Sequence, residues 1–279
     1  MGVRFLKSIV DQHLWIALSA LSLSAVSYFD YGLEPKKAIL LFAFGSCLCA
    51  YNYLNIQPRL HSVEKNQLTW PVIMISCGLM MMAYSFYVCG IALILLAAIP
   101  SAIVFLYILP LIPARNIKAG YRTELIPGRN NAWFKISLIA LAWTVSTYAI
   151  PILLDNPSPE LNPFITGFLQ RFFYVFGLTI PFDARDISID PAEMRTFAQR
   201  HGLKSSISFA TLVLGISAAI AAYSTTTGHL SENSLYIHLI TILTSIILIL
   251  FINGKSRYYF TFIIDGIMIL PLLIYQIIK

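Results

Sequence analysis

The chain has 279 residues, of which 58% are hydrophobic and only 11% are charged. Because a soluble domain carries roughly 25% charged residues, this composition excludes an ordinary soluble protein and predicts a chain that crosses a membrane several times. The net charge of +6 comes without a basic stripe interleaved with aromatic residues, so we expect no nucleic-acid partner.

Long apolar segments follow one another from residue 14 onward. Each is close to the ~20 residues that an α-helix needs to cross a hydrocarbon layer of ~30 Å. The predicted spans are residues 14–33, 38–57, 68–88, 90–109, 132–154, 162–182, 206–226, 235–253 and 259–278. The sequence therefore predicts one all-α integral membrane domain, residues 1–279, with about nine transmembrane helices.

The basic residues lie mainly on one side of these spans. Most of the 19 Lys and Arg residues precede the first span or fall in the loops after the second, fourth, sixth and eighth. Under the positive-inside rule these segments are cytoplasmic. We therefore expect a multi-pass protein of a bacterial inner membrane whose N-terminus and longer, functional loops face the cytoplasm.

Cysteine and histidine patterns exclude several kinds of site. The four cysteines lie in or beside spans without a C-x-x-C pair, and the five histidines form no H-E-x-x-H motif. We expect free thiols and no zinc site. The phosphate-loop, dinucleotide-binding and nucleophile-elbow motifs are also missing from the sequence, which argues against an ATPase, a dinucleotide enzyme or a serine hydrolase.

One cation falls inside a span. Arg171 lies about halfway along the sixth span, where a charged side chain costs ~2.5–3.5 kcal/mol on insertion scales. The side chain is therefore expected to face the protein interior. There Arg171 either forms a structural ion pair with an acid such as Asp265 in the ninth span, or it lines a substrate cavity.

Three aspartates follow the sixth span. Asp183, Asp186 and Asp190 are spaced three and then four residues apart, which places their carboxylates on one face of a helix. Three like charges beside a hydrocarbon layer repel one another. Such a cluster is stable if it faces water, pairs with bases or holds a divalent cation, and Mg²⁺ combines carboxylates with phosphate oxygens.

A second triplet ends the second span with the same spacing. Asn52, Asn55 and Arg59 repeat the three-residue and four-residue steps of the aspartates. Both triplets end even-numbered spans and so approach the same membrane surface. Amide oxygens can bind a hard cation but contribute no charge.

The segment IPFDARDISID, residues 180–190, resembles the second aspartate motif, D-x-x-D-x-x-x-D, of the UbiA superfamily of intramembrane prenyltransferases. The following segment MRTFAQRHG, residues 194–202, is similar to the stretch that succeeds this motif in the family. The resemblance covers essentially the whole chain and implies a UbiA-like helical bundle around a central cavity open to lipid.

The resemblance also implies an activity. Members of the family transfer a prenyl group from an isoprenyl diphosphate to a lipophilic, commonly aromatic, acceptor with Mg²⁺. Carried onto this chain, the metal ligands are Asp183, Asp186 and Asp190, and Asn52, Asn55 and Arg122 bind the diphosphate. Arg59, Arg115 and Lys118 are then the catalytic cations that stabilise the leaving group.

The first motif of the family, N-D-x-x-D-x-x-x-D, is altered here because Asn52, Asn55 and Arg59 replace its three aspartates. Arg59 either replaces a metal ion by binding phosphate oxygens or pairs with the aspartate cluster and closes the site. The alternative to an enzyme is therefore a catalytically impaired UbiA-like membrane protein that binds a lipid or a protein partner.

Aromatic residues are abundant, and their faces would stabilise a prenyl cation, although aromatic residues are also ordinary in membrane proteins. Tyr51 and Tyr107 are the aromatic residues expected nearest to the site.

Overall fold

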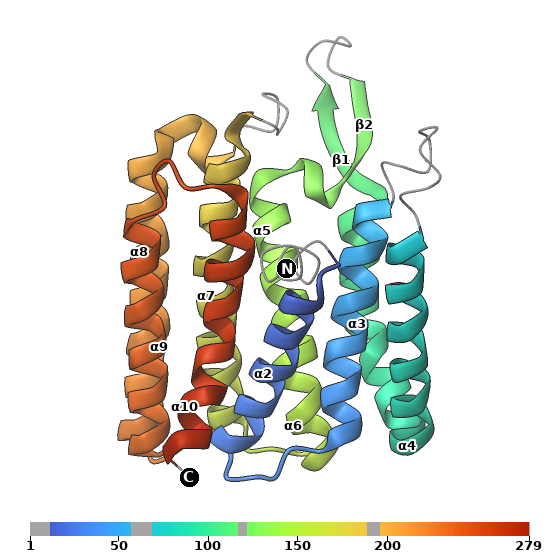
Figure 1. Cartoon of the computed structure of the whole chain (residues 1–279), viewed down its shortest axis with the longest axis vertical. Coiled ribbons are helices and arrows are strands. Elements are labelled where there is room, and N and C mark those ends of the chain that lie inside the picture. The colour runs from blue at the N-terminus through green and yellow to red at the C-terminus, as the bar shows by residue number, and fades with distance from the viewer. Residues whose placement is uncertain (1–11, 57–68, 117–121, 189–195, 279) are drawn as a thin grey trace, which may run out of the picture.

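The computed structural model describes residues 12–56, 69–116, 122–188 and 196–278. Within these ranges each predicted span corresponds to a helical segment, and the helices run up and down through one bundle (Figure 1). The α-helices are α2 (Leu14–Asp30), α3 (Lys37–Ile56), α4 (Thr69–Ile108), α5 (Ala132–Thr144), α6 (Ile150–Asp155), α7 (Leu161–Arg185), α8 (Phe197–Thr226), α9 (Glu232–Leu250) and α10 (Leu270–Ile278). The predicted all-α membrane bundle is confirmed.

Three stretches of the bundle depart from a continuous α-helix. A π-helical turn, Val145–Ala149, joins α5 to α6, and the segments Tyr259–Ile264 and Asp265–Ile269 precede α10. Helix α4 contains two predicted spans that meet at Gly90, whose φ of 66° is non-helical. Because glycine tolerates positive φ, the chain reverses there, and both ends of α4 lie at the top of Figure 1.

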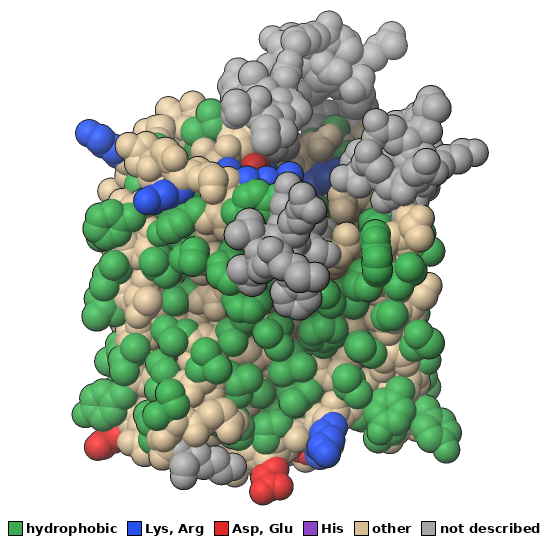
Figure 2. All heavy atoms as spheres, in the orientation of Figure 1, with side chains coloured by type: hydrophobic (Ala, Val, Ile, Leu, Met, Phe, Trp, Pro, Cys, Tyr) green, Lys and Arg blue, Asp and Glu red, His purple; other side chains and the backbone are tan. Residues whose placement is uncertain are grey.

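The outer surface of the bundle is apolar. Among the described residues, seven helices are long and apolar enough to cross a membrane, and Leu14–Asp30 is a shorter apolar helix. On the face shown in Figure 2, hydrophobic side chains cover the middle of the bundle, and charged side chains gather near its two ends. This distribution fits a protein whose helices are surrounded by lipid.

A two-stranded ribbon lies outside the bundle and was not predicted. Strand β1 (Pro110–Asn116) pairs antiparallel with β2 (Arg122–Pro127) at the top of Figure 1. Its register places Ile112 opposite Ile126. From the sequence this segment is only the loop after the fourth span, because it lies between two apolar segments. Its prolines are compatible with pairing because they are tolerated on the edges of a short ribbon.

Close backbone contacts fix the packing of α3 on α4. A Cβ atom added at Gly45 would lie 2.8 Å from the carbonyl oxygen of Gly78, and one added at Gly78 would lie 2.7 Å from the carbonyl oxygen of Gly45. The absence of side chains at these two positions lets the helices approach closely, as small residues do between membrane helices. This contact holds the wall of the cavity described below.

The segment after the aspartates forms a separate helical turn. Thr196 caps α8 through a capping box with Gln199, and Gly202, with φ 78°, interrupts the helix five residues into its length. The cap satisfies amide groups that the helix leaves free. Within the segment 194–202, α8 therefore begins after Thr196 and is interrupted at Gly202, before the seventh predicted span.

Candidate functional site

The ends of α3 and α7 both lie at the upper end of the bundle in Figure 1, where α3 ends at Ile56 and α7 at Arg185. Asp183 is in the last turn of α7 and is only 2% exposed. Its Oδ1 lies 3.0 Å from Nζ of Lys135, which is in the first turn of α5. The Asp183 carboxylate is therefore neutralised across two helices.

Asp186 has a different cationic partner. Nε and Nη2 of Arg185 donate to the two oxygens of Asp186 at 2.7 and 2.8 Å. The guanidinium of Arg185 also lies 5.0 Å from the ring centre of Phe182 and 5.7 Å from that of Phe260. A forked ion pair stacked on aromatic rings holds both side chains in a fixed arrangement.

Neither Lys135 nor Arg185 was among the site residues predicted from the sequence. A signal for Lys135 existed, because a cation in the first turn of a helix is disfavoured by the helix dipole and needs a nearby acid. Nothing in the sequence indicated that Asp183 is that acid. Arg185 lies inside the aspartate motif, but its contact with Phe260, far away in the sequence, is seen only in the structure.

At the end of α3, Asn52 is fully buried and Asn55 is partly exposed. The Asn52 Nδ2 donates to the carbonyl oxygens of Gln12 and Leu48 at 3.1 and 2.9 Å. The Asn52 Oδ1 has no hydrogen-bond partner among the described residues. A buried oxygen without a donor is energetically unfavourable, and it is the type of group that a cation or a water molecule satisfies.

The remaining predicted site residues are only partly covered by the structure. Arg59, Lys118 and Asp190 lie outside the described residues. The backbone of Arg115 lies in β1 opposite Thr123, and that of Arg122 lies in β2 opposite Asn116. The ribbon therefore brings these two positions close in register above the bundle.

The donor set at the upper end agrees in chemistry with a hard cation. Carboxylates of Asp183 and Asp186 and the amide oxygen of Asn52 are the oxygen ligands that Mg²⁺ uses. Within the part of the chain that the structure describes, no three Asp, Glu, His or Cys residues form a group that could hold a metal. Any such site would therefore depend on Asp190, on amide oxygens or on bound phosphate.

A cavity of about 390 Å³ lies below these residues, between α3, α4 and α5. Its volume is within the ~300–1,000 Å³ range of small-molecule sites. Five aromatic residues line it, namely Phe42, Tyr51, Phe105, Tyr107 and Trp143. The two tyrosines expected nearest to the site thus line the cavity, and the ring centres of Tyr51 and Trp143 lie 6.5 Å apart in an edge-to-face arrangement.

On the α4 side, residues that line the cavity are also exposed on the outer surface of the bundle. Leu79 and Phe105 both line the cavity and are 55% and 60% exposed. Such large apolar side chains face lipid in a membrane protein. A lipophilic molecule can therefore reach the cavity from the hydrocarbon layer without crossing water.

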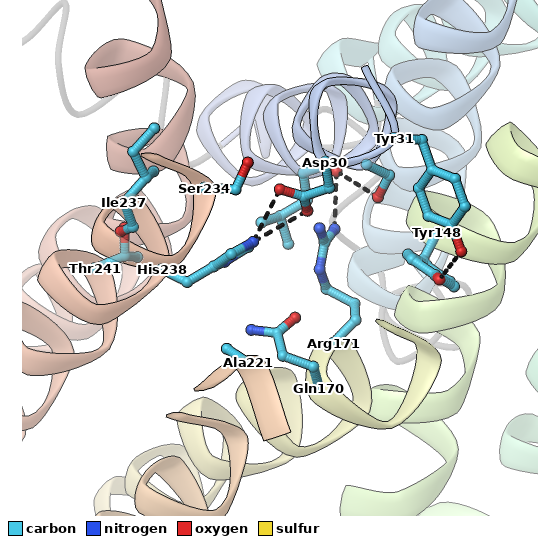
Figure 3. A network of polar contacts seen from close by, with 12 residues as sticks. Asp30, Tyr31, Tyr148, Gln170, Arg171, Ala221, Ser234, Ile237, His238 and Thr241 are labelled. Carbon is cyan, nitrogen blue, oxygen red and sulfur yellow. Dashed lines mark hydrogen bonds and ion pairs between the residues drawn. The ribbon is translucent and has the colours of Figure 1, made fainter. Parts of the chain in front are cut away.

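A separate polar network, drawn in Figure 3, surrounds Asp30 at the end of α2, which lies at the lower end of the bundle in Figure 1. The Nε2 of His238 lies 3.0 Å from both carboxylate oxygens of Asp30, at the end of α2. The hydroxyl of Tyr275 donates to Asp30 Oδ1 at 2.7 Å and lies 2.6 Å from Oγ of Ser234. This network joins α2, α9 and α10 through side chains that are buried, as for His238 and Ser234, or partly buried, as for Asp30 and Tyr275.

Arg171 belongs to this lower network, which corrects the suggested pairing with Asp265. The side chain is 2% exposed, as expected for a cation facing the interior. Its Nη1 donates to the carbonyl oxygen of Leu23 at 2.8 Å, and Asp30 is the carboxylate that acts on it electrostatically. Asp265 is instead influenced by Arg185 at the other end of the bundle. The sequence could not show whether Asp30 or Asp265 lies near Arg171, because both aspartates fall within predicted spans.

No protein-family model and no curated protein matches the chain. Two solved structures share its fold. A UbiA homolog from Aeropyrum pernix K1, solved in the apo form, superposes with a TM-score of 0.64 at 12% identity, over 95% of this chain and 97% of that chain. The second, described as digeranylgeranylglyceryl phosphate synthase in membranes, superposes with a TM-score of 0.56 at 13% identity, over 99% and 98% of the two chains.

Proposed function

Since the chain has a UbiA-like fold along nearly its whole length, we propose that it is a divergent UbiA-type intramembrane prenyltransferase. It transfers a prenyl group from an isoprenyl diphosphate to a lipophilic, aromatic acceptor, with Mg²⁺ as cofactor. In this proposal the upper end of the bundle faces the cytoplasm of a bacterial inner membrane.

The observation that carries the proposal is the continuity between the apolar cavity and the charged end above it. On α5, Leu138 and Ile139 line the cavity one turn below Lys135. On α3, Tyr51 lines the cavity and the next residue is the buried Asn52. A molecule with an apolar chain and a charged head would therefore place the chain among apolar side chains and the head among ionic ones.

Each part of the site has a role in this scheme. The aromatic faces of Tyr51, Tyr107 and Trp143 would stabilise the allylic cation that forms when the diphosphate leaves. The apolar walls would exclude water, which would otherwise capture that cation. The acceptor would enter from the lipid layer beside Leu79 and Phe105 and form a bond to the cation, and the proton that it loses would pass to the released diphosphate.

The charged end would bind and stabilise the diphosphate. Lys135 and Arg185 are the described cations beside the aspartates, and both can donate to phosphate oxygens. Arg59, Arg115, Lys118 and Arg122 remain proposed contributors of positive charge, with Asn55 on the same side. Asp183, Asp186 and Asp190, with the free oxygen of Asn52, would hold Mg²⁺, which when bound neutralises the charge of the diphosphate.

A second candidate function is favoured by the ion pairs themselves. Asp183 is paired with Lys135, and Asp186 is paired with Arg185. If these pairs persist in the presence of Mg²⁺, the aspartates stabilise the fold and the cavity binds a lipid or a protein partner without catalysis. The two functions differ in whether Asp186 is needed for binding of a diphosphate.

The test is the binding of radiolabelled farnesyl diphosphate to the purified protein, with and without Mg²⁺, in the parent chain and in Asp186→Ala. A matched control is Asp155→Ala, which removes an acid paired with Lys36 at the lower end of the bundle. For the enzyme, we expect affinity to need Mg²⁺, to fall at least tenfold in Asp186→Ala and to be unchanged in the control. Binding that ignores both Mg²⁺ and Asp186 would favour the non-catalytic function.

A further inference from the structure

The lower end of the cavity is closed by a cluster of buried apolar residues. Phe42 of α3 is 1% exposed, lines the cavity and belongs to this cluster together with Ala97, Leu93 and Ile150. The ring of Phe42 packs against that of Phe86, with ring centres 5.9 Å apart. A chain entering from the upper end would therefore meet Phe42, with densely packed side chains behind it.

The length of the cavity follows from the helices that line it. Along α5 its lining extends from Leu138 to Thr147, and along the second half of α4 from Ala97 to Tyr107. At ~1.5 Å per residue these stretches correspond to about 14–15 Å. Carbon–carbon bonds of ~1.5 Å make an extended isoprene unit, with four bonds along the chain, about 5 Å long. The cavity thus accommodates about three such units.

We propose that the cavity selects a prenyl chain of three isoprene units, and that Phe42 is the residue that sets this limit. The inference rests on the proposed function, because it assigns a chain length to the same cavity. Phe42 acts by occupying space: a fourth unit would have to displace its ring from the contact with Phe86. On the opposite wall Ala97, whose side chain is small, leaves the space that the third unit fills.

Three variants test the assignment. Phe42→Ala should lengthen the cavity and Ala97→Phe should shorten it, whereas Ile150→Ala is a matched control because Ile150 is equally buried in the cluster but does not line the cavity. Phe42→Leu serves as a milder form of the first variant should the alanine variant not fold.

The probe is a photoreactive farnesol analogue bound to the protein in lipid nanodiscs and displaced by unlabelled geraniol, farnesol, geranylgeraniol and a five-unit prenyl alcohol. In the parent chain we expect farnesol to compete at least tenfold better than the longer alcohols, since even a single methylene can change binding tenfold. Phe42→Ala or Phe42→Leu should bring geranylgeraniol to parity with farnesol, and Ala97→Phe should make geraniol the best competitor. Ile150→Ala should keep the parent order.

An unchanged order of alcohols in both the Phe42 and the Ala97 variants would overturn the assignment, as would a parent chain with no preference for farnesol or an equal shift in the control. The alcohols carry no diphosphate, so this outcome is independent of Mg²⁺ and of Asp186. Failure of the proposed function appears separately, as loss of Mg²⁺-dependent diphosphate binding in the previous experiment with the length preference intact.

Discussion

Nζ of Lys135 lies 3.0 Å from Oδ1 of Asp183, and this contact joins the first turn of α5 to the last turn of α7. Both side chains are largely withdrawn from solvent, with 15% and 3% of their surfaces exposed. Lys135 lies one turn from Leu138 and Ile139, which line the aromatic cavity, so the pair connects the stability of the bundle to the charge of the candidate site.

Replacing one member of this pair should destabilise the protein more than replacing both members together. Lys135→Met and Asp183→Asn each remove one charge of a buried ion pair and leave the other in place, which costs about 3–5 kcal/mol. The double variant removes both charges and should lose less than the sum of the single variants. The free energy of unfolding in detergent micelles, measured for all four proteins, gives the coupling energy directly. Additive losses would show that the contact contributes little.

The close approach of α3 and α4 should not tolerate a side chain at Gly45 or Gly78. Replacement of Gly45 by Leu forces the helices apart, because even a Cβ atom would lie 2.8 Å from a backbone oxygen. We expect a loss of about 1–3 kcal/mol in unfolding free energy and weaker binding of prenyl alcohols. Gly215→Ala is the control, since nothing lies within 4 Å of its added Cβ atom. Equal behaviour of the two variants would contradict the packing described here.

The lower network should support stability without affecting the upper site. His238→Ala removes one hydrogen-bond partner of the Asp30 carboxylate, which keeps the Tyr275 hydroxyl, and should cost about 1.5–3 kcal/mol of unfolding free energy. The control is His229→Ala at the same end, where the imidazole contacts Asn162 in an exposed position. Diphosphate binding, measured at a temperature where the variants remain folded, should be unchanged in both. A selective loss of diphosphate binding in His238→Ala would show that the two ends are coupled.

The aromatic face of Tyr51 should contribute to turnover if prenyl transfer proceeds through a cation. Tyr51→Phe keeps the ring and should retain activity within about threefold, whereas Tyr51→Leu loses a cation–π contact of about 0.5–2 kcal/mol, or roughly 2- to 30-fold in rate. Single-turnover rates with saturating substrate separate this effect from binding. Equal rates for the Phe and Leu variants would remove the aromatic face from the mechanism.

The sequence alone determined the class and the layout of the fold. Apolar segments of about 20 residues gave the positions of the spans, including the reversal at Gly90 within α4. The same local information located the polar groups at span ends, among them Asp183, Asp186 and Asn52. Hydropathy and spacing suffice for these features because the membrane acts on each segment separately and requires each to satisfy its own backbone.

Only the tertiary structure decided which groups meet. It paired Asp183 with Lys135, moved Arg171 from the suggested Asp265 to the network around Asp30, folded residues 110–127 into a ribbon and opened a cavity that ends at Phe42. These features depend on contacts between segments far apart in the chain. Such contacts are set by the shapes of packed helices and by the low dielectric between them, and a one-dimensional pattern carries neither.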